Sequence, residues 1–305
     1  MDKAGAGNQT GNFSYGSAKS MERLDMFKQS IHNPYFSANA SDIDDDSAML
    51  KTLDITLMAM NAALYAGIGY LVYSIFPAVA PTVGGVRFWP VVVIPATFAV
   101  LFGAIVGGGG AAIGIFISDL LIHGDPLLSL VAGVTANFAC FALIGYLSSR
   151  KLDWKKTFLS LGVGVAILAT LAYLIITPET IVNYFGTTLE QALWNTYFVL
   201  AIFVVSYAII ISVGLIRPKW RSFGAASVVG SIVGSAIVGI GVWGYTQFFA
   251  LPAAIGGASN LPYYAGMILF AWTFATEIPF IVVLVPPIAE ACYKAFPRLK
   301  ARREE

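Results

Sequence analysis

From Ile55 onward, the chain alternates between long apolar runs and brief polar breaks. A helix needs about 20 apolar residues to cross roughly 30 Å of hydrocarbon. Runs of this kind, two of them shorter, lie near residues 55–76, 90–106, 110–123, 127–148, 156–177, 191–216, 222–249 and 262–290. The pattern predicts an all-α, polytopic integral membrane bundle of about eight transmembrane helices, over residues 54–293.

The second and third runs are short, and they meet at four consecutive glycines, Gly107, Gly108, Gly109 and Gly110. One interpretation is a single broken element instead of two crossings. A straight helix from Pro90 to His123 would be about 50 Å long, too long for one span without extreme tilt.

The positions of the basic residues decide whether the second and third runs are two separate crossings or one merged element. They form three clusters, which are Arg150, Lys151, Lys155 and Lys156, then Arg217, Lys219 and Arg221, and finally residues 294–303. Cytoplasmic loops carry the excess of Lys and Arg, whereas the segment around Glu179 and Glu190 has no basic residue and should face outside. Eight crossings place every basic cluster on the cytoplasmic side, and merging the two short runs would place the first cluster outside. We therefore predict a multi-pass protein of the cell membrane with both termini in the cytoplasm.

Polar segments flank the apolar runs. Residues 1–53 are rich in Gly, Ser, Asn and Asp and contain no apolar run long enough for a signal-peptide core, which predicts a disordered cytoplasmic tail. Residues 294–305 form a basic cytoplasmic tail in this scheme.

Composition excludes several classes of function. Only 11% of the 305 residues are charged and the net charge is +1, so nothing favours a nucleic-acid partner. The sequence contains neither a G-x-x-x-x-G-K-[ST] phosphate loop nor an H-E-x-x-H zinc motif. With two histidines in all, His32 and His123, a metal or haem site is not expected. We therefore expect no cofactor, no metal and no enzymatic activity.

Polar side chains within membrane spans are costly in hydrocarbon and by default mark a pathway or a binding site. Those predicted toward the outer half are Arg87, Asp119, His123, Asp125, Asn195, Gln247, Asn260, Tyr263 and Tyr264, with Asn137, Trp243 and Trp272 deeper. Glu277 is the main polar residue of the inner half. Their convergence predicts a pocket that opens to the exterior, although boundary Trp and Tyr residues are also typical of an interfacial belt. The candidate substrate-binding residues are Arg87, Trp89, Asp119, Asn137, Asn195, Gln247, Asn260, Tyr263 and Trp272.

Arg87 is the only Lys or Arg predicted on the outer side of the membrane. As a binding residue it would hold a ligand carboxylate or phosphate, with Trp89 as a stacking face. As a structural residue it would pair with Asp119 or Asp125 and fix its loop. We favour the ion pair, because both acids are predicted at the same depth.

Small residues form a stripe on the first span, where Ala59, Ala63 and Gly67 recur at intervals of four and Ala62 and Ala66 lie beside them. Such residues allow close approach of helix backbones in lipid. The stripe serves either internal helix packing or docking to another membrane protein.

The order of several motifs resembles a known family. The sequence ALYAGIGYL from Ala63 is followed by a proline-containing loop, by GGVRFWPVVVIPATFAVLFGAIVGGGGAAIGIFISDLL and by a further helix to Leu147, and the chain closes on TEIPFIVVLVPPIAEACYKAF. The F-G-x-x-x-G turn lies at Phe102, Gly103 and Gly107. Together these segments cover roughly a third to a half of the chain. They resemble the substrate-binding S component of energy-coupling factor transporters.

The resemblance implies capture of a vitamin or other micronutrient in a pocket near the outer surface, capped by the loop between the first two helices. Members of the family then topple in the membrane, driven by a transmembrane coupling protein and two ATPase subunits, which fits the missing phosphate loop. The family's docking face maps onto Ala59, Ala62, Ala63, Ala66 and Gly67. The family core has about six helices, so the extra pair and the long N-terminal tail depart from it.

Two other functions stay open. One is a structural or assembly subunit of a larger membrane complex, in which the small-residue faces pack permanently against neighbours and no ligand exists. The other is an intramembrane enzyme that acts on lipids. This alternative lacks support, because no paired carboxylates or metal cluster lie at a suitable spacing in the sequence.

The predicted topology can be tested by cysteine labelling from outside the cell. A cysteine placed at Gly186 or Gly257 should react with an impermeant reagent, and one placed at Asp153 or Lys219 should not, because the basic loops are cytoplasmic. Labelling at Asp153 from outside would show that the eight-span arrangement is wrong.

Overall fold

The computed structural model describes residues 52–80, 83–150, 153–175 and 188–297, together with a few single residues. These residues belong to one unit, Thr52–Glu305, and only this unit is described below. Residues 1–51 of the predicted N-terminal tail lie outside the described residues, as does most of the predicted C-terminal tail, 294–305.

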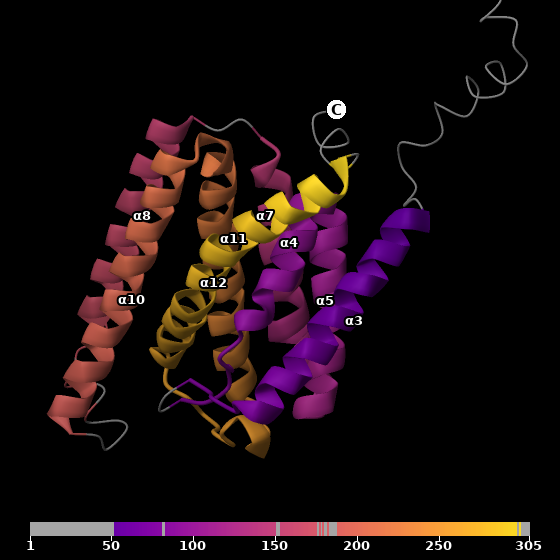
Figure 1. Cartoon of the computed structure of the whole chain (residues 1–305). Coiled ribbons are helices and arrows are strands. Elements are labelled where there is room, and N and C mark those ends of the chain that lie inside the picture. The colour runs from indigo at the N-terminus through magenta and orange to yellow at the C-terminus, as the bar shows by residue number, and fades with distance from the viewer. Residues whose placement is uncertain are drawn as a thin grey trace, which may run out of the picture. The chain divides into compact units, whose positions relative to one another are not determined.

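Helices make up most of the described chain, and the predicted all-α class is confirmed (Figure 1). They follow in the order α3 (Thr52–Ile75), the 3-10 turn η1 (Pro90–Val92), α4 (Val93–Phe102), α5 (Ala104–Ile122), α6 (Pro126–Leu128), the π-helical segment η2 (Ser129–Val134), α7 (Thr135–Ser148), α8 (Trp154–Ile175), α10 (Leu189–Ile216), η3 (Pro218–Trp220), α11 (Arg221–Thr246), η4 (Ala253–Ile255) and α12 (Ala265–Ala295). Seven of the eight predicted apolar runs fall mainly on one helical segment each, the fourth on the continuous series α6, η2 and α7. The second run, 90–106, instead covers η1, α4 and the start of α5.

Within the described residues, five helical segments are long and apolar enough to cross a membrane. They are Thr52–Ile75, Ala104–Ile122, Pro126–Ser148, Pro218–Thr246 and Ala265–Ala295. The apolar segment Pro90–Phe102 is shorter. The chain is therefore a helical membrane protein, and the number of eight crossings stays a prediction.

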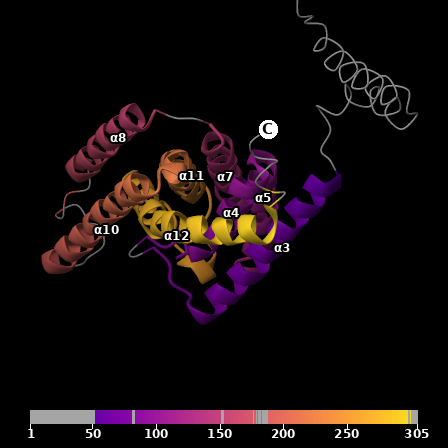
Figure 2. The same ribbon diagram turned by 45° about the horizontal axis from the view of Figure 1, so that its top comes forward.

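The core of the bundle forms where α5, α7, α11 and α12 pack in sequence, α5 on α7, α7 on α11 and α11 on α12. α3 packs on α5 at one edge of the bundle, and α8 and α10 lie at the opposite edge in both views (Figures 1 and 2). α4 packs against α5, α7, α12 and α3, so this short helix is enclosed by the longer ones. The loops at the ends of these helices position the site.

The break between α4 and α5 lies at Gly103, and the prediction of a break at the glycines from Gly107 to Gly110 is wrong. Gly103 has a φ of 94°, a left-handed value that favours glycine. The chain folds back there, so that a Cβ on Gly107 would collide with Ala99. The four glycines instead lie inside α5, where the absence of side chains lets neighbouring helices approach closely. A Cβ on Gly108 would lie 2.9 Å from the Phe138 carbonyl of α7.

The small-residue stripe of α3 divides between two faces. Ala62 and Ala66 are buried, and a Cβ on Gly114 of α5 would lie 2.9 Å from the carbonyl of Ala62. Ala59, Ala63 and Gly67 are exposed, and nothing lies within 4 Å of a Cβ on Gly67. Ala62 and Ala66 thus pack inside the bundle, which leaves an exposed stripe of three residues.

Candidate functional site

A short hairpin between α3 and η1 carries Arg87 into the bundle. Val79 and Arg87 form an isolated antiparallel bridge, and the backbone N–H of Phe88 donates to Ala78 at 2.9 Å. Gly84 and Gly85 both have positive φ, and the N–H of Gly85 donates to the Ile255 carbonyl at 2.7 Å. The hairpin is therefore attached to the segment between α11 and α12.

Beneath this hairpin lies a cavity of about 70 Å³, which we call the Arg87 cavity. Its polar lining consists of Arg87, Trp89, Asp119, His123, Asn137, Thr273 and Glu277. Its apolar lining consists of Val86, Ile115, Leu128, Ala132, Val238, Val242 and Ile255, with Gly85 and Gly133. Since one water needs about 10–15 Å³ by this measure, the cavity holds about five waters or a small ligand. A vitamin-sized molecule would require the hairpin or a helix to move.

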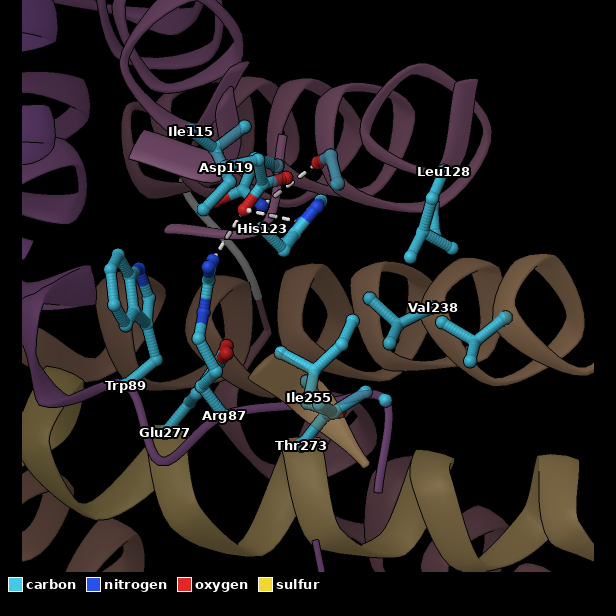
Figure 3. Close-up of a pocket in the computed structure, with 16 residues that line it drawn as sticks. Arg87, Trp89, Ile115, Asp119, His123, Leu128, Val238, Ile255, Thr273 and Glu277 are labelled. Atoms are coloured by element: carbon cyan, nitrogen blue, oxygen red, sulfur yellow. Dashed lines mark hydrogen bonds and ion pairs between the residues drawn. The ribbon is translucent and has the colours of Figure 1, made fainter. Parts of the chain in front are cut away.

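Asp119 of α5 is the centre of the polar network (Figure 3). Arg87 donates from Nη2 to Asp119 Oδ1 in a buried ion pair, and Ser129 donates from Oγ to Asp119 Oδ2 at 2.6 Å. His123 Nε2 lies 3.6 Å from Asp119 Oδ1. The backbone N–H of Asp125 donates to His123 Nδ1 at 3.2 Å, which leaves the imidazole proton on Nε2 facing the carboxylate. The ion pair expected for Arg87 is confirmed, with Asp119 as its partner.

Aromatic side chains fix the guanidinium from the other side. The Arg87 guanidinium carbon lies 4.4 Å from the centroid of the Trp89 ring, within the range of a cation–π contact. Trp89 Nε1 donates to the Tyr65 hydroxyl at 2.9 Å, which donates in turn to Asn137 Oδ1 at 2.7 Å. Asn137 Nδ2 donates to the Gly133 carbonyl at 2.9 Å. A relay of buried and part-buried hydrogen bonds therefore links the hairpin to α3 and α7, which holds Trp89 in one orientation.

Two glycines make room for these side chains. A Cβ on Gly69 of α3 would lie 2.5 Å from the Trp89 ring, and a Cβ on Gly133 would lie 2.6 Å from Asp119 Oδ2. Both helix positions accept only a residue without a side chain unless the site moves. The site therefore depends on the close approach of side chains to the glycine backbone of neighbouring helices, as well as on its polar groups.

Asp125, which follows the turn after α5, contacts His123 of this network through its backbone N–H and other elements through its carboxylate. Its carboxylate caps α6 by accepting the N–H of Leu128 at 2.9 Å, and it also accepts the hydroxyl of Tyr245 on α11. Burial raises the pKa of the Asp125 carboxyl, but these hydrogen bonds outweigh burial and hold the pKa below its usual value. Asp125 therefore accepts as a carboxylate at neutral pH and joins α11 to the start of α6.

The structure brings together four of the nine predicted site residues. Arg87, Trp89, Asp119 and Asn137 line the Arg87 cavity, and the side chain of Asn195 lies outside the described residues. The other four, Gln247, Asn260, Tyr263 and Trp272, are not among its lining residues.

These four residues lie elsewhere in the structure, mostly near its surface. Gln247 is exposed and donates to the Leu261 carbonyl at 2.9 Å, and Asn260 is an exposed turn residue with a φ of 51°. Tyr263 has 68% of its surface exposed, and Trp272 is half-buried. The expected convergence of these residues on one pocket does not extend to the Arg87 cavity, because Gln247 follows the last turn of α11 and Asn260 and Tyr263 lie in the segment before α12, away from the helical residues that line the cavity.

The prediction missed several residues of the cavity. His123 and Glu277 stood out as polar residues within spans but were not assigned to the site, and Thr273 was overlooked. The spacing of Thr273 and Glu277, four residues apart on one helix, was a usable signal. Nothing local in the sequence indicated Ser129 as the second donor to Asp119.

Comparison with protein-family models, with curated proteins and with solved structures finds no match to this chain. The resemblance to S components therefore stays a prediction based on the order of the sequence motifs.

The ion pair predicts non-additive effects on stability. Arg87→Ala and Asp119→Asn should each lower the free energy of unfolding by about 3–5 kcal/mol, because each leaves the other charge buried without a partner. The double variant should lose less than the sum. Thermal and denaturant unfolding of the purified protein in detergent measures all three.

Arg217→Ala provides the matched control, because Arg217 pairs with Glu290 at 3.0 Å with 53% of its side chain exposed. Its loss should cost less than about 1 kcal/mol. Strict additivity of the Arg87 and Asp119 variants would contradict the energetic coupling.

Proposed function

We propose that this chain is the substrate-binding membrane subunit of an energy-coupling factor type importer, with eight crossings and both termini in the cytoplasm. It captures a vitamin or other micronutrient from outside and releases it inside. A separate coupling protein and two ATPase subunits supply the energy. The observation that carries the proposal is the Arg87 cavity, a partly polar space lined by residues of α5, α6, η2, α7, α11, η4 and α12 and by the hairpin between α3 and η1.

Three further features support this proposal. The hairpin stands where the resemblance places the cap of the binding pocket, between α3 and η1. Arg87 Nη1 is buried and has no hydrogen-bond partner within the described residues, so a donor is available to a ligand. The exposed stripe of Ala59, Ala63 and Gly67 lies on α3, the helix that corresponds to the family's docking helix.

One observation favours the alternative, a structural or assembly subunit without a ligand. The Arg87–Asp119 pair connects the hairpin to α5 and gives both residues a structural role that requires no ligand. A subunit of this kind would keep the same exposed stripe for a permanent neighbour.

Mass spectrometry of small molecules released from gently purified protein separates the two functions. A binding subunit should carry one compound enriched over an unrelated membrane protein purified in the same way. If no compound is enriched and the chain purifies in a fixed assembly without ATPases, the proposed function is wrong and the alternative is supported.

The docking face makes a second prediction. Ala63→Trp should abolish pull-down of a coupling protein and leave the melting temperature of the isolated chain unchanged, because Ala63 is exposed and only an approaching helix would meet the indole. Ala201→Trp is the control, since Ala201 is also exposed but lies on α10, across the bundle from α3 (Figure 2). Equal pull-down of the Ala63 variant and the control would remove the argument for this face.

A further inference from the structure

Arg87 and Glu277 both line the Arg87 cavity, and the two side chains do not pair with each other. Arg87 uses Nη2 for Asp119, and its buried Nη1 has no partner in the described part of the chain. Glu277 of α12 lines the same cavity, and among the described residues nothing is hydrogen-bonded or ion-paired to its carboxylate. A charged group inside a membrane protein is expensive unless a partner satisfies it. The chain itself thus leaves one donor and one acceptor open toward the same small space.

The lining excludes simpler occupants. A metal ion is disfavoured, because the described residues contain no cluster of three or more His, Cys, Asp or Glu side chains that could hold one. A plain anion would face the carboxylates of both Asp119 and Glu277, and a plain cation would face the guanidinium of Arg87. The arrangement instead suits a molecule that carries both signs of charge.

Much of the remaining lining is aliphatic and suits a short carbon chain. Leu128, Val238, Val242 and Ile255 contribute only methyl and methylene groups to the cavity wall. The Thr273 hydroxyl donates to the Leu269 carbonyl at 2.8 Å, so its proton is already used. Asn137 is hydrogen-bonded to Tyr65 and Gly133, and His123 faces Asp119. Arg87 Nη1 and the Glu277 carboxyl group are therefore the polar groups of the lining that we assign to a ligand.

We infer that the Arg87 cavity binds a small zwitterion, with its carboxylate on Arg87 Nη1 and its ammonium group on Glu277. The ligand carboxylate then meets the open donor of Arg87, and the ligand ammonium group gives Glu277 the cationic partner that stabilises its carboxylate form. Both contacts are then charge-assisted hydrogen bonds. The inference rests on the proposed function of the chain as a substrate-binding subunit and specifies the substrate class of that site.

The test measures the melting temperature of the full chain in detergent with three zwitterions of increasing length, glycine, β-alanine and 4-aminobutyrate. Each is compared with its amide, which lacks the carboxylate, and with its N-acetyl derivative, which lacks the ammonium group. At least one zwitterion should raise the melting temperature, and neither of its derivatives should do so to the same extent. No shift with any of the three, as expected of a cavity that holds only water, would overturn the inference. An equal shift with the N-acetyl derivative would also overturn it.

Glu277→Gln tests the acceptor and keeps the shape of the side chain. It should weaken binding of the stabilising zwitterion by about tenfold or more, because a neutral amide replaces the charged partner of the ammonium group. The variant should still fold, since a neutral group is less costly to bury. Glu290→Gln is the control on the same helix, because Glu290 pairs with Lys219 at 2.8 Å and is not among the cavity's lining residues. Equal zwitterion affinity of the Glu277 variant and the unaltered chain would show that Glu277 is not the acceptor.

The outcomes separate this inference from the proposed function. A co-purified compound without an amine, together with no zwitterion shift, would support substrate capture and overturn the zwitterion. A zwitterion that binds through Glu277 without being taken up by cells would support the binding site and contradict import.

Discussion

The buried ion pair between Arg87 and Asp119 is the interaction around which the site is arranged. It attaches the hairpin before α4 to α5, and it needs help from both sides because charges are costly in an apolar bundle. Ser129 donates a hydrogen bond to the Asp119 carboxylate, His123 lies beside the same carboxylate, and the Trp89 ring lies against the Arg87 guanidinium. These contacts satisfy the Asp119 carboxylate, but the Arg87 Nη1 group has no hydrogen-bond partner among the described residues. The same pair therefore supports the fold and presents a donor to the cavity.

Close helix packing makes this polar centre possible. Lipid is as apolar as a leucine side chain, so helices in a membrane gain stability from contact and polar bonds instead of from exclusion of water. Gly69 and Gly133 bring α3 and η2 near enough for Trp89 and Asp119 to fit. Gly108 does the same between α5 and α7. These three glycines thus serve as contact surfaces between packed segments.

The sequence alone determined the class of the protein and part of its site. Hydrophobic run length is a local property set by the thickness of the bilayer, so the apolar runs lie on helical structure, although the boundary between the second and third runs differs from the break in the structure. A pairing of Arg87 with Asp119 or Asp125 was also predictable, because rare charges at one depth in an apolar chain have few other partners, and the structure selects Asp119. The position of Trp89 beside Arg87 followed from their nearness in the chain.

Only the tertiary structure decided which faces of the helices meet. It continued α5 through the four glycines from Gly107 to Gly110, and it buried Ala62 while it left Ala63 exposed. It also brought Glu277 into the cavity and kept Gln247 outside it. Depth in the membrane can be counted along the sequence, but rotation of a helix about its own axis cannot, because an all-round apolar helix carries no amphipathic signal. Rotation is set by contacts between residues far apart in the chain, and these contacts determine which polar groups share a pocket.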